Sequence, residues 1–300
     1  MGLLEDRVAI VTGAGRGLGR EEALALAAEG ARVVVNDLGV SLAGEVETGD
    51  SPAALVVEEI RQAGGTAIAN GDDVADWAGA GRLVAQAYDT FGRLDILVNN
   101  AGVLRDRMSF NMTEAEFDLV MRVHCKGHYA TSHQAVRRWR DAAKATGAAV
   151  YGRIINTVSE AGLYGSAGNS NYAMAKAAIA ALTQSLAREM GRYGVTSNFM
   201  APRARTRMTL STPTGSMFEA PAEGFDPWNP AWPAQFVVFL ASELASDING
   251  QGFVSWANEI ELVSGWHSIG KVAHTAGAFM ARDIPGRLDE LFGSSPRQPA

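Results

Sequence analysis

The chain has 300 residues, of which 47% are hydrophobic and 20% charged, a composition that excludes a disordered or fibrous protein. Its formal net charge of -7 argues against a nucleic-acid partner, because phosphate contacts need a basic surface. Cys125 is the only cysteine and no apolar stretch reaches about twenty residues, so we expect a cytoplasmic protein with no intrachain disulfide and no membrane span.

Strand and helix patterns alternate along the first two thirds of the chain. Short apolar runs predict strands at 8–11, 32–35, 67–69, 94–98, 153–157 and 195–199. Helical spacing predicts helices at about 21–29, 53–63, 81–91, 114–143 and 172–193. Repetition at this period predicts an α/β protein with a three-layer, doubly wound parallel sheet of the Rossmann type, in a single domain over residues 1–300.

Three segments interrupt this rhythm. A polar, glycine-containing insertion is expected at about 38–52, and a tail with no clear pattern at about 266–300. Residues 202–233 collect Pro, Met, Phe and Trp without periodicity. A long loop with these residues is expected to cover a substrate, although a passive surface loop has the same composition.

A glycine-rich turn at 12–19 follows the first strand and precedes the first helix. Glycines there allow a tight turn and let the amides at the helix N-terminus approach a pyrophosphate. Because the turn lies inside a βαβ unit, nucleotide binding is favoured over a purely structural role. The expected cofactor residues of this turn are Gly13, Arg16, Gly17, Leu18 and Gly19.

Asp37 ends the second predicted strand, about twenty residues after the turn, where a carboxylate can accept hydrogen bonds from the adenosine ribose. It would repel a 2′-phosphate, whereas Arg16 could pair with one. Asp37 is closer to the discriminating hydroxyl, so NAD is expected rather than NADP. The alternative is that Asp37 only caps a turn, which either cofactor would tolerate.

Three further residues suggest proton chemistry. Tyr172 and Lys176 are four residues apart and so project from one helix face. A nearby Lys176 cation would lower the pKa of Tyr172 towards that of a general base. Ser159 follows the strand at 153–157, at the carboxyl end where open α/β sheets bind ligands, and could hold a substrate oxygen. Each has a structural alternative, as an exposed helix pair or a helix cap. No Gly-x-Ser-x-Gly elbow surrounds Ser159, which argues against a serine hydrolase.

These motifs, in this order, resemble the short-chain dehydrogenase/reductase family over about residues 5 to 265. The resemblance implies that Asp73 and Val74 meet the adenine and that the turn containing Asn100, Ala101 and Gly102 supports the cofactor site. It also implies that Ser159, Tyr172 and Lys176 are catalytic, with Tyr172 and Lys176 also contacting the cofactor, and that the protein forms a homotetramer or homodimer through its long helices. No metal is expected.

The chain departs from the usual family pattern at two places. His124 stands where the family has a helix asparagine, and Pro202-Arg203 stands where it has Pro-Gly. Both departures resemble the (3R)-hydroxyacyl-CoA dehydrogenase domain of peroxisomal multifunctional enzyme type 2 and related bacterial proteins. This implies that His124 takes the fourth catalytic position, with an imidazole that is structural or proton-transferring. It also implies that Pro202 and Thr206 border the nicotinamide.

The expected reaction is therefore NAD-dependent interconversion of a secondary alcohol and a ketone, with a 3-hydroxyacyl-CoA and its 3-oxoacyl-CoA as the first substrate class. Arg203, Arg205 and Arg207 could meet CoA phosphates, or could be solvated or ion-paired. Alternatives are a hydroxysteroid or other lipophilic alcohol as substrate, an NADPH-dependent 3-oxoacyl thioester reductase, and a non-catalytic module that senses NAD.

Overall fold

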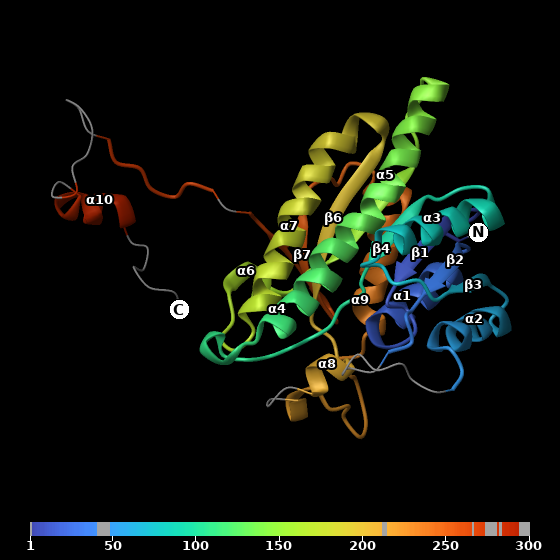
Figure 1. Ribbon diagram of the computed structural model, residues 1–300, viewed down its shortest axis with the longest axis horizontal. Helices are drawn as coiled ribbons and strands as arrows, with labels where there is room; N and C mark the ends of the chain where they lie inside the picture. Colours follow the sequence, from blue (N-terminus) through green and yellow to red (C-terminus); the bar gives the residue numbers. More distant parts are fainter. Residues whose placement is uncertain are drawn as a thin grey trace. The chain divides into compact units, whose positions relative to one another are not determined.

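The computed structural model describes residues 2–40, 49–211, 215–265, 267–273, 281 and 284–293. The chain forms two compact units, residues 1–263 and 264–300 (Figure 1). In the described part of the second unit a 3-10 turn, Pro285–Arg287, leads into the short helix α10 (Leu288–Phe292). Residues 41–48 of the predicted insertion and residues 266, 274–280, 282–283 and 294–300 of the predicted tail lie outside the described residues.

The middle layer of the first unit is one eight-stranded sheet of order β3-β2-β1-β4-β5-β6-β7-β8. Its strands are β1 (Val8–Thr12), β2 (Arg32–Asn36), β3 (Thr66–Asn70), β4 (Ile96–Asn99), β5 (Gly152–Thr157), β6 (Val195–Pro202), β7 (Gly252–Trp256) and β8 (Glu259–Val263). All neighbours are parallel except β7 and β8. The predicted doubly wound sheet is confirmed, and its winding reverses between β1 and β4.

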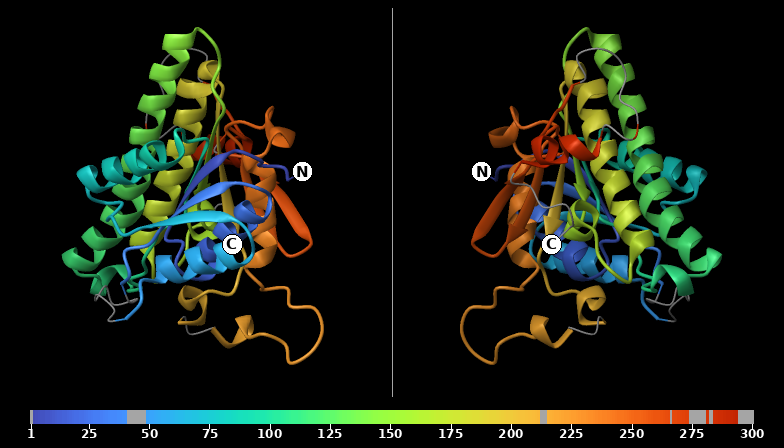
Figure 2. Two further views of the ribbon diagram at one scale, coloured as in Figure 1. Left: turned by 90° about the vertical axis from the view of Figure 1, so that its right-hand side faces the viewer. Right: turned by 90° about the vertical axis from the view of Figure 1, so that its left-hand side faces the viewer.

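Helices cover both faces of this sheet (Figure 2). One face carries α1 (Gly17–Ala28), α2 (Pro52–Gln62) and α9 (Ala231–Ala241), whose apolar side chains form one core with the sheet. The other carries α3 (Trp77–Phe91), α5 (Gly127–Thr146) and α7 (Ser170–Met190), which form a second core. Because both faces are covered, strands such as β1 are buried at every position and have no polar alternation.

The predicted helix at 114–143 is present and contains a change of helical type. It begins as α4 (Glu114–Met121), where Thr113 and Glu116 form a reciprocal capping box. A π-helical segment, Arg122–Lys126, then separates α4 from α5. The predicted helical stretch is confirmed, but apolar periodicity does not register this one wider turn, which changes where the following side chains point. His124 lies inside this segment and is fully buried.

Strands β7 and β8 and helix α9 were not predicted. Helix α9 has apolar residues all around it, which removes the amphipathic period that identifies a surface helix. Two short helices, α6 (Glu160–Tyr164) and α8 (Arg207–Leu210), follow β5 and β6. In the described part of the chain no helix is long and apolar enough to cross a membrane.

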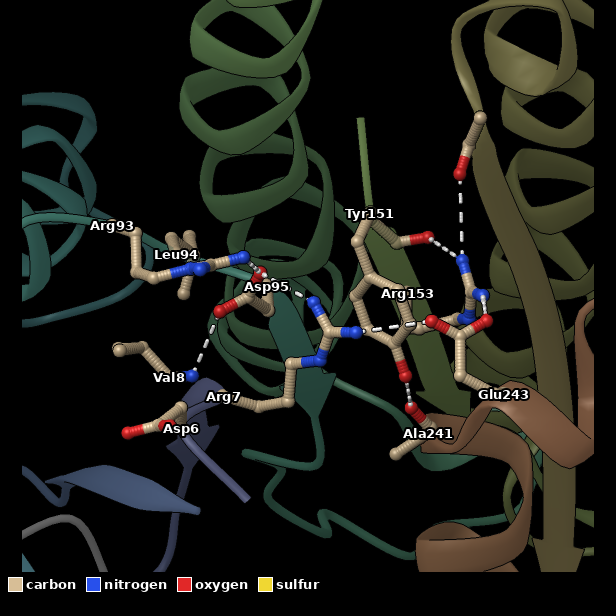
Figure 3. A network of polar contacts seen from close by, with 12 residues as sticks. Asp6, Arg7, Val8, Arg93, Leu94, Asp95, Tyr151, Arg153, Ala241 and Glu243 are labelled. Carbon is tan, nitrogen blue, oxygen red and sulfur yellow. Dashed lines mark hydrogen bonds and ion pairs between the residues drawn. The ribbon is translucent and has the colours of Figure 1, made fainter. Parts of the chain in front are cut away.

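An ion-pair network lies at the amino-terminal ends of the strands (Figure 3). The buried Asp95 carboxylate accepts the Val8 amide at 2.9 Å and the Arg93 guanidinium at 2.6 Å. Arg7 lies 3.8 Å from Asp95 and 3.0 Å from Glu243, which follows α9. The ring of Tyr151 contacts the Arg7 guanidinium at 3.6 Å, and Tyr151 donates to the Ala241 carbonyl. This network joins β1, β4 and α9 on the edge of the sheet opposite the site described next.

Candidate active site

A cleft opens where the parallel strands end, at the point where the winding reverses. Every predicted cofactor residue except Tyr172, Lys176 and Pro202 lines it. Its walls are Gly13, Arg16, Gly17, Leu18, Gly19, Asn36, Asp37, Leu38, Val40, Asp72, Asp73, Val74, Asn100, Ala101, Gly102, Val103, Leu119, Arg122, Val123, Thr206, Arg207 and Met208. Segments distant in sequence therefore meet at one edge of the sheet, as ligand sites in open α/β sheets do.

The glycine turn has the backbone that a pyrophosphate requires. Gly13 has φ +64° and Gly17 has φ +54°, a region that side chains other than glycine rarely adopt. A Cβ on Gly19 would lie 2.4 Å from the Gly13 carbonyl oxygen. Helix α1 starts here with no capping side chain and no acidic residue in its first turn. Its amino end is therefore suited to an anion from a ligand.

Asp37 is held at the rim of this cleft by backbone amides. Its Oδ2 accepts the Gly15 N–H at 2.9 Å, and its Oδ1 accepts the Gly39 N–H at 2.8 Å. Each oxygen has further acceptor capacity. The carboxylate is thus oriented across the glycine turn.

Two other predicted residues anchor the cleft walls. Asp73 pairs with Arg122 at 2.8 Å, which joins the end of β3 to the π-helical segment. The Asn100 side chain donates to the carbonyls of Thr12 at 3.0 Å and Gly13 at 3.3 Å. The end of β4 is therefore fixed to the glycine turn.

Ser159 and Tyr172 lie together next to the cleft. Ser159 caps α6, and its Oγ accepts the Ala161 N–H at 3.2 Å, which leaves the hydroxyl proton for another acceptor. Asn171 is fully buried and accepts the Tyr172 N–H at 2.8 Å, fixing the start of α7. Burial raises the pKa of Tyr172 to about 12, and a hydrogen bond with Ser159 opposes this rise only in part.

Lys176 lies under the same site. Its Nζ donates to the Thr157 carbonyl at 2.6 Å and is 5.6 Å from the centre of the Tyr172 ring. Burial lowers the pKa of Lys176 to about 7. Lys176 is not among the groups that shift the pKa of Tyr172 here, so its predicted effect on that pKa stays a prediction. Desolvation of the phenol dominates, and the same desolvation weakens the charge on the lysine.

His124 packs edge-on against Tyr172, with ring centres 5.3 Å apart. Its Nε2 is 3.1 Å from the Val103 nitrogen and 2.9 Å from the Val103 carbonyl oxygen. Burial lowers the pKa of His124 to about 3, so the imidazole is neutral at physiological pH. A Cβ on Gly102 would lie 2.4 Å from His124 Cε1, so this histidine requires a glycine opposite it.

The three arginines after β6 do not form one anion site. Arg203 pairs with Glu160 and Glu261, and Arg205 pairs with Asp226. Arg207 lines the cleft beside Thr206, which caps α8. Pro202 ends β6 outside the cleft wall. Of the alternatives that the sequence left open for these arginines, ion pairing within the protein is the one that Arg203 and Arg205 show.

Several site residues were missed from the sequence. Thr157 holds Lys176 through its carbonyl, Asn171 fixes Tyr172, and Arg122 pairs with Asp73. Thr157 is the last residue of β5, two residues before Ser159, so its position at the carboxyl end of the strand was a usable signal. Among the described residues no group of three or more His, Cys, Asp or Glu could hold a metal ion.

Comparison with known proteins defines the class. A family model described as short chain dehydrogenase matches residues 7–214. The chain belongs to the short-chain dehydrogenase family, whose members bind nicotinamide cofactors and oxidise or reduce at CH–OH carbons. Its fold and its cleft at the point of reversal agree with this assignment.

Particular relatives are similar over most of this chain. It is 44% identical to the hydroxyacyl-CoA dehydrogenase ChsB1 of Mycobacterium tuberculosis, over 98% of this chain and 92% of that protein. It is 40% identical to the mouse peroxisomal multifunctional enzyme type 2, over 93% of this chain but only 34% of that longer protein.

Two solved structures are also similar. One is a short chain dehydrogenase from Mycobacterium avium, with 47% identity and a TM-score of 0.87 over 100% of this chain and 99% of that one. The other is a short chain dehydrogenase from Burkholderia cenocepacia in complex with NADP, with 30% identity and a TM-score of 0.71 over 84% of this chain and 97% of that one.

Proposed function

We propose that this protein is an NAD-dependent dehydrogenase that interconverts a 3-hydroxyacyl-CoA and a 3-oxoacyl-CoA. The observation that carries the proposal is the meeting of the Ser159 and Tyr172 hydroxyls above Lys176, next to a cleft built for a dinucleotide. Two hydroxyls at one place can serve a single substrate oxygen, one by holding it and one by exchanging its proton.

The glycine turn would hold the pyrophosphate of NAD, Asp37 its adenosine ribose, and Lys176 its nicotinamide ribose. A bound NAD would supply the hydride acceptor for oxidation of the alcohol carbon. In the direction of ketone reduction the Tyr172 hydroxyl, which keeps its proton because burial raises its pKa to about 12, donates that proton to the substrate oxygen. Ser159 donates a hydrogen bond to the same oxygen, and in the direction of oxidation the proton returns to Tyr172. Lys176, with a pKa of about 7, can exchange a proton with its surroundings at physiological pH. His124 supports Tyr172 and Val103 by packing, since a neutral buried ring is poorly suited to proton exchange.

The substrate class is supported by the relatives. Both the mycobacterial and the mouse proteins carry names from acyl-CoA or peroxisomal chemistry and align over nearly all of this chain. Long apolar side chains also gather after β6, where Phe218 and Trp228 pack at 4.7 Å. The preference for NAD is supported by the Asp37 carboxylate, which would repel a 2′-phosphate.

Assembly and location are further parts of the proposal. The outer faces of α5 and α7 expose Tyr129 and Met174, and a groove between these helices is lined by Cys125, Ala178 and Leu182 among others. Apolar helix faces of this kind suit a homodimer or homotetramer. We propose that the protein works in the cytoplasm.

Replacement of Tyr172 by phenylalanine tests the mechanism. With a 3-hydroxyacyl-CoA and NAD, we expect Tyr172→Phe to lower kcat by about 10²–10⁴-fold, because general acid–base catalysis contributes that much. NAD binding, followed by quenching of tryptophan fluorescence, should stay within about twofold. Tyr193→Phe, just beyond the far end of α7, is the matched control and should retain full turnover. Normal turnover in Tyr172→Phe would disprove the proposed role.

A further inference from the structure

Arg203 links three elements around Ser159. It donates to both carboxylate oxygens of Glu160, from Nε at 2.9 Å and from Nη2 at 2.7 Å. Its Nη1 donates to Glu261 on β8 at 3.1 Å. The guanidinium therefore uses each of its nitrogens, with a two-pronged contact on Glu160 that fixes direction as well as distance.

Glu160 is the residue directly after Ser159 and the first residue of α6. On its other side α6 presses against α7, because a Cβ on Gly162 would lie 2.6 Å from the Lys176 Cβ. Helix α6 is thus held between the Lys176 backbone and the Arg203 side chain. Since α6 is only five residues long and Ser159 caps it, any movement of α6 moves the Ser159 hydroxyl.

The backbone of Arg203 is held by the sheet. Its amide donates to the Ser255 carbonyl at 2.9 Å, which continues the pairing of β6 with β7. The Trp256 ring lies 5.9 Å from the guanidinium. Arg203 therefore fixes the position of α6 relative to the sheet.

We propose that Arg203 is a positioning residue, which holds Ser159 at the correct distance from Tyr172 by clamping Glu160. This proposal rests on the proposed roles of Ser159 and Tyr172. The clamp is partly exposed, with 28% and 36% of the two side chains accessible, so it contributes little to folding. Its removal should act on the geometry of the reaction, where a displacement of about 1 Å can cost up to about 10²-fold in rate.

Four variants test the clamp: Arg203→Gln, Arg203→Lys, Glu160→Gln and the double variant Arg203→Gln/Glu160→Gln. We expect each glutamine variant to lower kcat about tenfold. The NAD dissociation constant should stay within about twofold and the melting temperature within a few degrees. The double variant should be no slower than either single one, because both remove the same contact. Arg203→Lys keeps the charge but loses the two-pronged contact on Glu160, so its kcat should fall between those of the wild type and Arg203→Gln.

The matched control is Arg140→Gln, which removes an arginine–carboxylate pair on α5 and should leave kcat unchanged. The proposal is overturned if kcat stays within twofold of wild type in the single variants, if the losses add in the double variant, or if only the melting temperature falls. Where one glutamine variant does not fold, Arg203→Lys and the other single variant decide by the same criteria. Tyr172→Phe in the same assay separates the two claims. An active Tyr172→Phe refutes the proposed mechanism, whereas an inactive one with normal Arg203→Gln refutes the clamp alone.

Discussion

At the scale of single residues, the carboxyl group of Glu22 is buried in a place that disfavours its charged form. It lies on α1, one turn after Leu18 of the cleft, and is fully buried. Neither carboxylate oxygen has a hydrogen-bond partner among the described residues. Burial raises the pKa of Glu22 to about 8, with Lys176 opposing the rise. The protonated form is therefore the stable one in the folded protein at neutral pH.

Glu22 should make stability depend on pH. Between pH values of about 4.5 and 8 the unfolded chain has lost this proton and the folded chain keeps it. The free energy of unfolding therefore falls by about 1.4 kcal/mol for each unit by which the pH rises in this range. We expect Glu22→Gln to stabilise the protein at pH 8, on the order of a few kcal/mol, and less at pH 5. Urea unfolding at both pH values measures the difference. An equal effect at both, or the same trend in the exposed control Glu189→Gln, would contradict the assignment.

The candidate catalytic residues could be predicted from the sequence, because the position of each one within the predicted elements suggests its role. Tyr172 and Lys176 share a helix face, and Ser159 follows a strand end. Their protonation states could not be predicted from the sequence, because desolvation depends on what covers a side chain in three dimensions. The Arg203 clamp was missed for a related reason, since Glu160 and Glu261 are far from it in sequence.

At the scale of elements, the amino-terminal network of Figure 3 is separate from the chemistry. We expect Asp95→Asn to destabilise the protein by about 1.5–3 kcal/mol, because buried hydrogen bonds to a charged group are lost. The kcat should stay within about twofold, since the network lies at the opposite edge of the sheet from the cleft. Urea unfolding and initial rates measure both quantities. Asp141→Asn, which breaks an exposed pair, is the control and should leave the free energy of unfolding close to that of the wild type. A loss of activity at unchanged stability in Asp95→Asn would contradict this separation.

Elements were predicted well where they have a periodic pattern and poorly where they do not. The six predicted strands and the helices α1, α2, α3 and α7 are present, with ends shifted by a few residues. The π-helical segment and the fully apolar α9 have no such signature. Strand β8 exposes Ile260 and Leu262 and pairs only along β7, so its sequence does not look like that of a buried strand.

At the scale of the whole first unit, the winding of the chain explains why the site exists. The parallel strands end at one edge, so residues near 13, 37, 73, 100 and 206 meet in one cleft although they span much of the chain. Alternation of strands and helices in the sequence was enough to predict this meeting. It could not show that Arg203 and Arg205 are neutralised by Glu160, Glu261 and Asp226 rather than available to a CoA phosphate, because those pairings arise only in the folded chain.

The most direct test of the central claim is the initial rate at the absorbance band of the reduced nicotinamide. The purified protein is given NAD or NADP and a panel of 3-hydroxyacyl-CoA esters and hydroxysteroids. We predict turnover of a 3-hydroxyacyl-CoA with NAD, and a much lower rate with NADP because of Asp37. Turnover with NADP alone, or of hydroxysteroids alone, would contradict the account.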